Sequence, residues 1–348
     1  MKLQEKTLWK NIKSERFWPV YLITGSEGYL KQKYVALLAE HAVPAGLEAF
    51  NSRTLNGDQF QMEELIDAVT ALPAMSPRTC TLVHDLDFSS LKEEDYQQML
   101  ELLGDLTDTG VLIFWQDTKG FPLKTKKMKE LQKAIDRAGA VVTLDARTHG
   151  DLVAFLQSTC QKQGNPLSAG AAEYLLNSVG EDMNTLVNEV EKLCNYADGA
   201  ITEKEIDAVS VKSLEATAFQ MVDALLDGNF DRVFHSLNIL FEQRTEPMMI
   251  LGALISTYSD MYRVKVATEA GAGPQILKRY FPQAYRSDFK LRNAARRSKR
   301  FTLGSLRRSL EILAEADATL KSSMIDQQTV FEKLLIELGR VRARQDAC

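Results

Sequence analysis

Short apolar runs alternate with segments of helical periodicity through the first 147 residues, and this alternation most constrains the fold. Four of these runs have the length and composition of buried strands and lie at 20–23, 79–84, 111–115 and 140–144. Between them, apolar residues recur at helical spacing, as in 29–40 and in 65–72, where Pro73 is expected to end the helix. Strands that alternate with helices predict a parallel sheet covered by helices on both faces.

After Thr148 the strand signals disappear and the sequence has helical periodicity. Long amphipathic helices are expected at 217–226, 230–243, 247–268, 303–320 and 329–341. A chain of 348 residues exceeds the size at which a single core usually keeps growing. We therefore expect an α/β domain at 1–147, a small helical domain at 148–211 and a larger helical domain at 212–348.

Composition excludes several classes of protein. The net charge of -5 gives no overall attraction to nucleic acid, so any contact with it requires a local basic surface. The four cysteines, Cys80, Cys160, Cys194 and Cys348, are far apart and form no zinc-binding or disulfide pattern. The N-terminus lacks the apolar region of a signal peptide, and the longest apolar stretch is too short to span a bilayer. We expect a cytoplasmic protein that holds no metal and no cofactor.

The turn after the first strand occupies the place of a phosphate-binding loop. Its residues are Gly25, Ser26, Glu27, Gly28, Tyr29 and Leu30. A working P-loop has a longer glycine-bracketed turn that ends in Gly-Lys-Ser/Thr, because the lysine neutralises phosphate and the hydroxyl holds magnesium. Here a carboxylate, Glu27, enters the turn, and Tyr29-Leu30 replaces the Lys-Ser/Thr pair. The turn is expected not to bind ATP, and the simplest alternative is an ordinary strand-turn-helix.

Four segments together resemble the delta subunits of bacterial DNA polymerase III clamp loaders. They are YLITGSEGYL at 21–30, LPAMSPR at 72–78, NEVEKL at 188–193 and DATLK at 317–321. The resemblance spans nearly the whole chain; no segment is a unique signature, but their order and spacing are specific. It implies a degenerate AAA+ fold, with an α/β domain, a helical lid and a helical collar that joins a five-subunit ring. Delta-prime, a relative that carries zinc-binding cysteines and a Ser-Arg-Cys motif, fits less well.

The resemblance also implies a function and partners. Such a protein binds and opens the β sliding clamp for loading onto primed DNA, without hydrolysing ATP itself, as part of the DNA polymerase III holoenzyme. Its partners are the clamp, the gamma/tau and delta-prime subunits, and primed DNA within the complex. The alternatives are a nucleotide-binding AAA+ ATPase, which would bind ATP at 25–31, and a stand-alone DNA-binding protein.

Clamp binding in this family uses apolar side chains at the tip of the helix before the strand at 79–84. The matching positions here are Leu72, Pro73, Ala74 and Met75. Relatives often have a Leu-Phe or Phe-Phe pair where this chain has Ala74-Met75, and methionine is flexible enough to fill an apolar pocket. Without the resemblance, Leu72 and Met75 would be expected to belong to the core at a helix end.

One region is strongly basic. No acidic residue occurs between 289 and 310, where the cations include Lys290, Arg292, Arg296, Arg297, Lys299 and Arg300. Such a surface could contact DNA phosphates or neighbouring subunits, and a solvated helix face is an equally good explanation. The same question arises in the first domain for a second set of cations: Lys124, Lys126, Lys127, Lys129 and Lys133.

Overall fold

The computed structural model describes residues 2–121, 125–282, 284–285, 288–322 and 325–343. The chain divides into two compact units, unit 1 (Met1–Ala146) and unit 2 (Arg147–Cys348). Unit 1 combines strands and helices, whereas the described part of unit 2 is helical apart from one bridge between Leu167 and Ile201. The expected fold class, a parallel α/β unit followed by all-α structure, is confirmed. A division of unit 2 at 211 stays a prediction.

Unit 1 is built on a six-stranded sheet in the order β1-β6-β2-β5-β4-β3, and all neighbouring strands are parallel. The strands are β1 (Lys2–Leu3), β2 (Val20–Thr24), β3 (Ser52–Asn56), β4 (Thr79–His84), β5 (Gly110–Trp115) and β6 (Ala140–Thr143). The four strands predicted from apolar runs are confirmed as β2, β4, β5 and β6. The other two are additions: β1 is very short, and β3 is an edge strand with no fully buried side chain, so neither has an apolar run.

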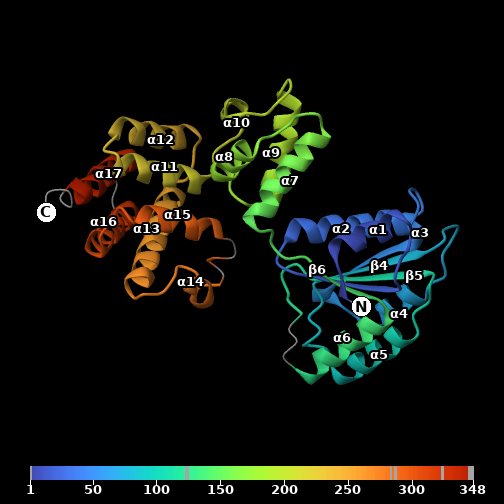
Figure 1. Cartoon of the computed structure of the whole chain (residues 1–348). Helices are drawn as coiled ribbons and strands as arrows, with labels where there is room; N and C mark the ends of the chain where they lie inside the picture. Colours follow the sequence, from blue (N-terminus) through green and yellow to red (C-terminus); the bar gives the residue numbers. More distant parts are fainter. Residues whose placement is uncertain (1, 122–124, 283, 286–287, 323–324, 344–348) are drawn as a thin grey trace. The chain divides into compact units, whose positions relative to one another are not determined.

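Helices cover both faces of this sheet (Figure 1). On one face lie α1 (Glu5–Lys13) and α2 (Gly28–Ala42), and on the other α4 (Met62–Thr70), α5 (Glu93–Gly104) and α6 (Lys126–Ala138). The short helices α3 (Glu48–Asn51) and η1 (Gly57–Gln59) flank β3. Each long helix turns an apolar stripe toward the sheet, as with the buried Leu131 and Ile135 of α6.

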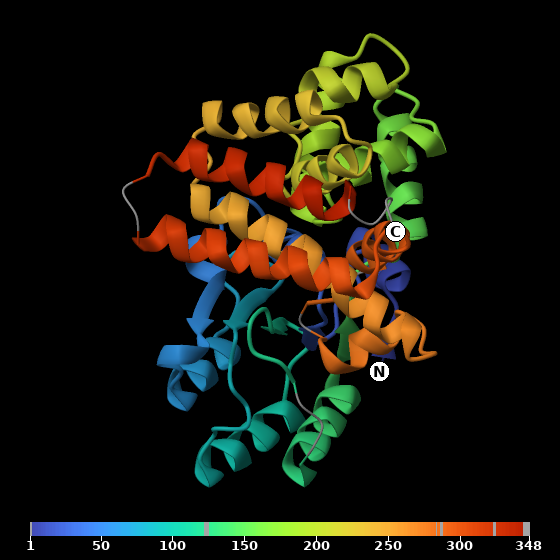
Figure 2. The same ribbon diagram turned by 90° about the vertical axis from the view of Figure 1, so that its left-hand side faces the viewer.

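Unit 2 consists of helices, and those from residue 214 onward pack around one continuous apolar core. The helices of unit 2 are α7 (His149–Lys162), α8 (Ala169–Val179), α9 (Met183–Tyr196), α10 (Glu203–Val209), α11 (Leu214–Leu226), α12 (Phe230–Glu242), α13 (Pro247–Glu269), α14 (Ile276–Tyr280), α15 (Asp288–Ser298), α16 (Leu303–Ser322) and α17 (Gln327–Ala343). The five long helices predicted from periodicity are confirmed as α11, α12, α13, α16 and α17. Helix α16 packs against both α13 and α17, and the three helices run side by side in Figure 2. Tyr258 and Phe331 are among the fully buried side chains.

Within the described residues, three of the cysteines can be placed: Cys80, Cys160 and Cys194 are free, and Cys348 lies outside them. No cluster of three metal-binding side chains occurs in that part of the chain. None of its helices is long and apolar enough to cross a membrane.

Candidate functional site

In the turn between β2 and α2, three backbone N–H groups donate hydrogen bonds to acceptors within the protein. Gly25 has a φ of +120°, and a side chain there would collide with the backbone of Leu144. The N–H of Ser26 donates to Asp145 Oδ1 (3.3 Å) and that of Glu27 to the Leu144 carbonyl (3.0 Å). The N–H of Tyr29 donates to Glu27 Oε1 (3.2 Å). These are the donors that would have to face a phosphate in a working P-loop.

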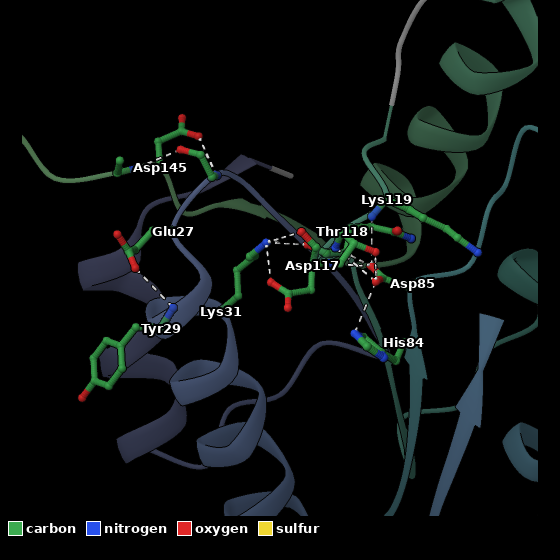
Figure 3. A network of polar contacts seen from close by, with 12 residues as sticks. Glu27, Tyr29, Lys31, His84, Asp85, Asp117, Thr118, Lys119 and Asp145 are labelled. Atoms are coloured by element: carbon green, nitrogen blue, oxygen red, sulfur yellow. Dashed lines mark hydrogen bonds and ion pairs between the residues drawn. The ribbon is translucent and has the colours of Figure 1, made fainter. Parts of the chain in front are cut away.

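A lysine that the sequence analysis gave no role is buried beside this turn. Lys31, in the first turn of α2, is 2% exposed. Its Nζ lies 2.8 Å from the Gln116 carbonyl, 3.2 Å from the Asp117 carbonyl and 3.1 Å from Asp117 Oδ1, at the end of β5 (Figure 3). Lys31 therefore stabilises the carboxyl-terminal edge of the sheet, where β5 ends.

Asp85, directly after β4, organises the same edge. Its carboxylate accepts hydrogen bonds from the N–H groups of Asp117, Thr118 and Lys119 and from the Thr118 hydroxyl (Figure 3). Burial alone would raise the pKa of Asp85, but these hydrogen bonds together hold its pKa below the usual value. Asp85 is buried, and its carboxylate positions the loop after β5.

The loop between α4 and β4 presents two large apolar side chains to solvent. Helix α4 ends at Thr70, so the prediction that it continues to Pro73 is wrong, and Leu72 lies in the loop beyond it. Leu72 is 87% exposed and Met75 is 82% exposed. Since neither belongs to the core of unit 1, the alternative that they are core residues at a helix end is excluded. Pro73 is half-buried between them, and Ala74 is exposed.

A buried asparagine fixes the conformation of this loop. Asn51, at the end of α3, accepts a hydrogen bond from the Ala74 N–H (2.7 Å) and donates to the Ala74 carbonyl (3.0 Å). Its amide also donates to the Leu47 carbonyl (2.9 Å), which fixes its own orientation. Met75 has a φ of +54°, an unfavourable conformation for a residue with a side chain. We call the two hydrogen bonds between Asn51 and Ala74 the clasp. The sequence gave no indication of it, because the two residues are 23 positions apart.

Phe50, the neighbour of Asn51 in α3, is another exposed apolar side chain. It is 65% exposed. Because Asn51 bonds Ala74 directly, the backbone of Phe50 lies close to the loop that contains Leu72 and Met75. This loop and the end of α3 therefore offer three large apolar side chains, and sequence reasoning identified two of them.

Most guanidinium groups of the basic region have carboxylate partners inside unit 2. Arg297 is 5% exposed, contacts both oxygens of Asp223 (2.8 and 2.7 Å) and lies over the Phe219 ring. Further ion pairs join Arg292 to Glu181, Arg296 to Asp223, and Arg300 to Asp227. Lys290 and Lys299 have no ion pair with a described carboxylate. The contact role predicted for this region stays a prediction, and its most buried member stabilises the unit. Lys124, from the second set of predicted cations, lies outside the described residues.

Comparisons with known proteins agree with this architecture. Residues 21–143 match the family model for "DNA polymerase III, delta subunit" and residues 215–338 that for "DNA polymerase III delta subunit, C-terminal domain". The Bacillus subtilis protein "DNA polymerase III subunit delta" is 22% identical in sequence, over 97% of this chain and 98% of the length of the Bacillus protein. A protein of Aquifex aeolicus named "Probable DNA polymerase III subunit delta" is 24% identical in sequence, over 77% of this chain and 75% of the length of the Aquifex protein.

A solved structure shows the same fold. The Bacillus subtilis "DNA clamp loader delta protein" superimposes with a TM-score of 0.73 at 20% identity, over 96% of this chain and 98% of that protein. The matched segments lie in both units and follow the same order along the chain. This chain belongs to the DNA polymerase III delta subunit family.

Proposed function

We propose that this chain is the clamp-opening subunit of a bacterial clamp loader and binds the β sliding clamp through the loop Leu72–Met75. One observation carries the proposal: a member of the delta family holds Leu72 and Met75 almost fully in solvent on a loop clasped by Asn51. A pair of exposed, positioned apolar side chains is what an interface anchor requires, because binding then orders little that was mobile.

Opening the clamp follows from differential affinity. A ring that is closed when free opens when a protein binds its open form better than its closed form, and no hydrolysis by that protein is needed. In this proposal the loop supplies that preference. ATP would act on the other subunits, gamma/tau, which together with delta-prime and primed DNA complete the complex in the cytoplasm.

The degenerate loop supports a role without ATP hydrolysis. The N–H groups of Ser26, Glu27 and Tyr29 donate to protein acceptors, and Lys31 is paired with Asp117. A nucleotide would have to displace these contacts before its phosphates found donors. We therefore expect no ATP binding by the isolated chain, measurable as unchanged fluorescence of a labelled nucleotide analogue at millimolar magnesium.

The decisive test is binding of the purified chain to its own β clamp without nucleotide. The wild type is expected to bind, and Leu72→Ala with Met75→Ala is expected to weaken binding about 30-fold or more, from the loss of roughly 2 kcal/mol. A matched control replaces two exposed apolar side chains of unit 2, Met249→Ala with Ile325→Ala, and should bind as the wild type does. Wild-type binding that the loop variant leaves intact would place the interface elsewhere, and no binding at all would overturn the proposed function.

A further inference from the structure

Two cysteines that are far apart in the sequence lie together in unit 2. Cys160 is in the last turn of α7, and Cys194 is in the last turn of α9. They are 34 positions apart, which is why the sequence contains no disulfide pattern for them. In the structure the two thiols lie within hydrogen-bonding distance of each other. We call these two side chains the α7–α9 thiol pair.

Hydrogen bonds hold the ends of the two helices together. Helices α7 and α9 pack against each other, and the N–H of Asn165 donates to the Cys160 carbonyl at the end of α7 (3.0 Å). The side-chain amide of Asn165 donates to the carbonyls of Ala197 (2.9 Å) and Gly199 (3.0 Å), directly after α9. Since Asn165 is itself 8% exposed, the chain on both sides of the thiol pair is fixed by a buried junction. The two thiols are therefore adjacent because the backbone brings them together.

The two thiols differ in their access to solvent. Cys160 is fully buried, whereas Cys194 is half-buried. Burial raises the pKa of both thiols, that of Cys160 to about 12. At Cys194 the hydrogen bond from Cys160 acts against burial and lowers the pKa, because it stabilises the Cys194 thiolate. The thiolate is the reactive form of cysteine, so a small oxidant from solvent meets the more accessible and better stabilised thiolate at Cys194.

Two other roles for such a pair are a simple apolar filling of the core and a metal site. A protein metal site usually has three or four ligands, and no cluster of three metal-binding side chains occurs in the part of the chain that the structure describes. Two thiols that only fill space would stay reduced in the presence of an oxidant. Two adjacent thiols of unequal exposure instead match a reactive cysteine with a resolving cysteine beside it.

We propose that the α7–α9 thiol pair is a site of oxidation by hydrogen peroxide and closes to an intramolecular disulfide. The Cys194 thiolate attacks a peroxide oxygen, the O–O bond breaks, and the leaving hydroxide takes up the proton lost by Cys194, which gives a sulfenic acid and one water. The Cys160 sulfur then attacks the Cys194 sulfur, and hydroxide leaves with the Cys160 proton as a second water. Two thiols are oxidised to one disulfide, and one peroxide is reduced to two waters. The site lies in unit 2 and does not rest on the clamp-binding proposal.

The test treats the full, folded chain with millimolar hydrogen peroxide, blocks the remaining thiols by alkylation and digests with trypsin without reduction. Trypsin places Cys160 on the peptide 148–162 and Cys194 on the peptide 193–204. Mass spectrometry of the monomeric protein should find these two peptides joined, with the loss of two hydrogens, and dithiothreitol should separate them. The unfolding temperature should rise by about 5 °C on oxidation, because the cross-link restricts the unfolded chain, and should return on reduction.

Single substitutions separate the two roles. Cys160→Ala should stop the reaction at the sulfenic acid of Cys194, which dimedone traps, whereas Cys194→Ala should leave Cys160 reduced. The matched control is Cys80→Ala, which removes a buried thiol from β4 of unit 1 and should form the disulfide as the wild type does. Circular dichroism of each reduced variant shows that it has the wild-type fold before peroxide is added.

Three results would overturn the proposal. The first is a wild-type pair that stays reduced under conditions that fully oxidise free glutathione. The second is a disulfide of either cysteine that forms only between chains. The third is a dimedone adduct on Cys160 in the Cys194→Ala variant at the rate seen for Cys194 in the Cys160→Ala variant, since the two thiols would then have no division of roles.

Discussion

In the loop Leu72–Met75 of unit 1, two large apolar side chains face solvent, whereas in the basic region of unit 2 most guanidinium groups face a carboxylate. The loop is ordered by hydrogen bonds to its backbone, which leave its side chains free. The basic region is held by ion pairs of its arginine side chains, so fewer of these cations are available to an external partner. A charged side chain can find its partner within its own chain, while an exposed apolar one gains only when another surface covers it.

The largest effect that we expect from this comparison is the loss of stability on substitution of Arg297. Arg297→Ala should lower the free energy of unfolding by about 3 kcal/mol, because Asp223 loses its bidentate partner and Phe219 loses its covering cation. Chemical denaturation followed by circular dichroism measures this change. Lys299→Ala, at an exposed position two residues away, is the control and should change it by less than about 0.5 kcal/mol. If Arg297→Ala lowered the free energy of unfolding as little as Lys299→Ala does, the Arg297–Asp223 pair would not stabilise unit 2, and the basic region would be a free surface.

A substitution of Asp85 tests whether an ionised side chain also stabilises the fold of unit 1. Asp85→Asn should cost about 2 kcal/mol at pH 7, because the charge-assisted hydrogen bonds to 117–119 are lost. Since the folded pKa lies below the unfolded value of about 3.9, this stabilisation is present above that value and is lost as pH falls through the folded pKa. Unfolding at pH 7 and at pH 3 should thus show the gap between wild type and variant closing in acid. A gap of constant size would rule out the ionised carboxylate as its cause.

The clasp tests whether order in the loop matters for binding. Asn51→Ala removes both hydrogen bonds to Ala74 while leaving Leu72 and Met75 in place. Clamp affinity should fall about tenfold, because the loop must then be ordered on binding. Asn51→Asp keeps the acceptor for the Ala74 N–H and should lose less. Hydrogen exchange at 74–76 gives a second measure: faster exchange with unchanged clamp affinity would show that the clasp has no part in binding.

The smallest effect concerns the backbone of Met75. Met75→Ala and Met75→Gly both remove the apolar side chain, but only glycine adopts a φ of +54° without strain. We expect the glycine variant to be more stable than the alanine variant by about 1 kcal/mol, measured by thermal unfolding. Both variants should bind the clamp weakly. Equal stability would show that the loop relaxes to another conformation when the side chain is absent.

Much of the fold followed from local patterns. Strands β2, β4, β5 and β6 are buried and therefore apolar, and the long helices of unit 2 have apolar stripes, so both are visible in sequence. Strand β3 was missed because an exposed edge strand has no apolar run. The end of α4 was misplaced because Leu72 continues the helical spacing of Leu65 and Val69, although it has no core to pack against.

The sequence by itself determined the fold class, the order of the elements and the absence of a complete P-loop, because these depend on residues that are near one another along the chain. Only the tertiary structure decided that Leu72 and Met75 are exposed, that Asn51 clasps Ala74, and that Arg297 is buried against Asp223. Each of these depends on a partner more than 20 residues away or on the lack of one. Local composition cannot specify such pairings, because burial and hydrogen bonding are set by which elements pack together.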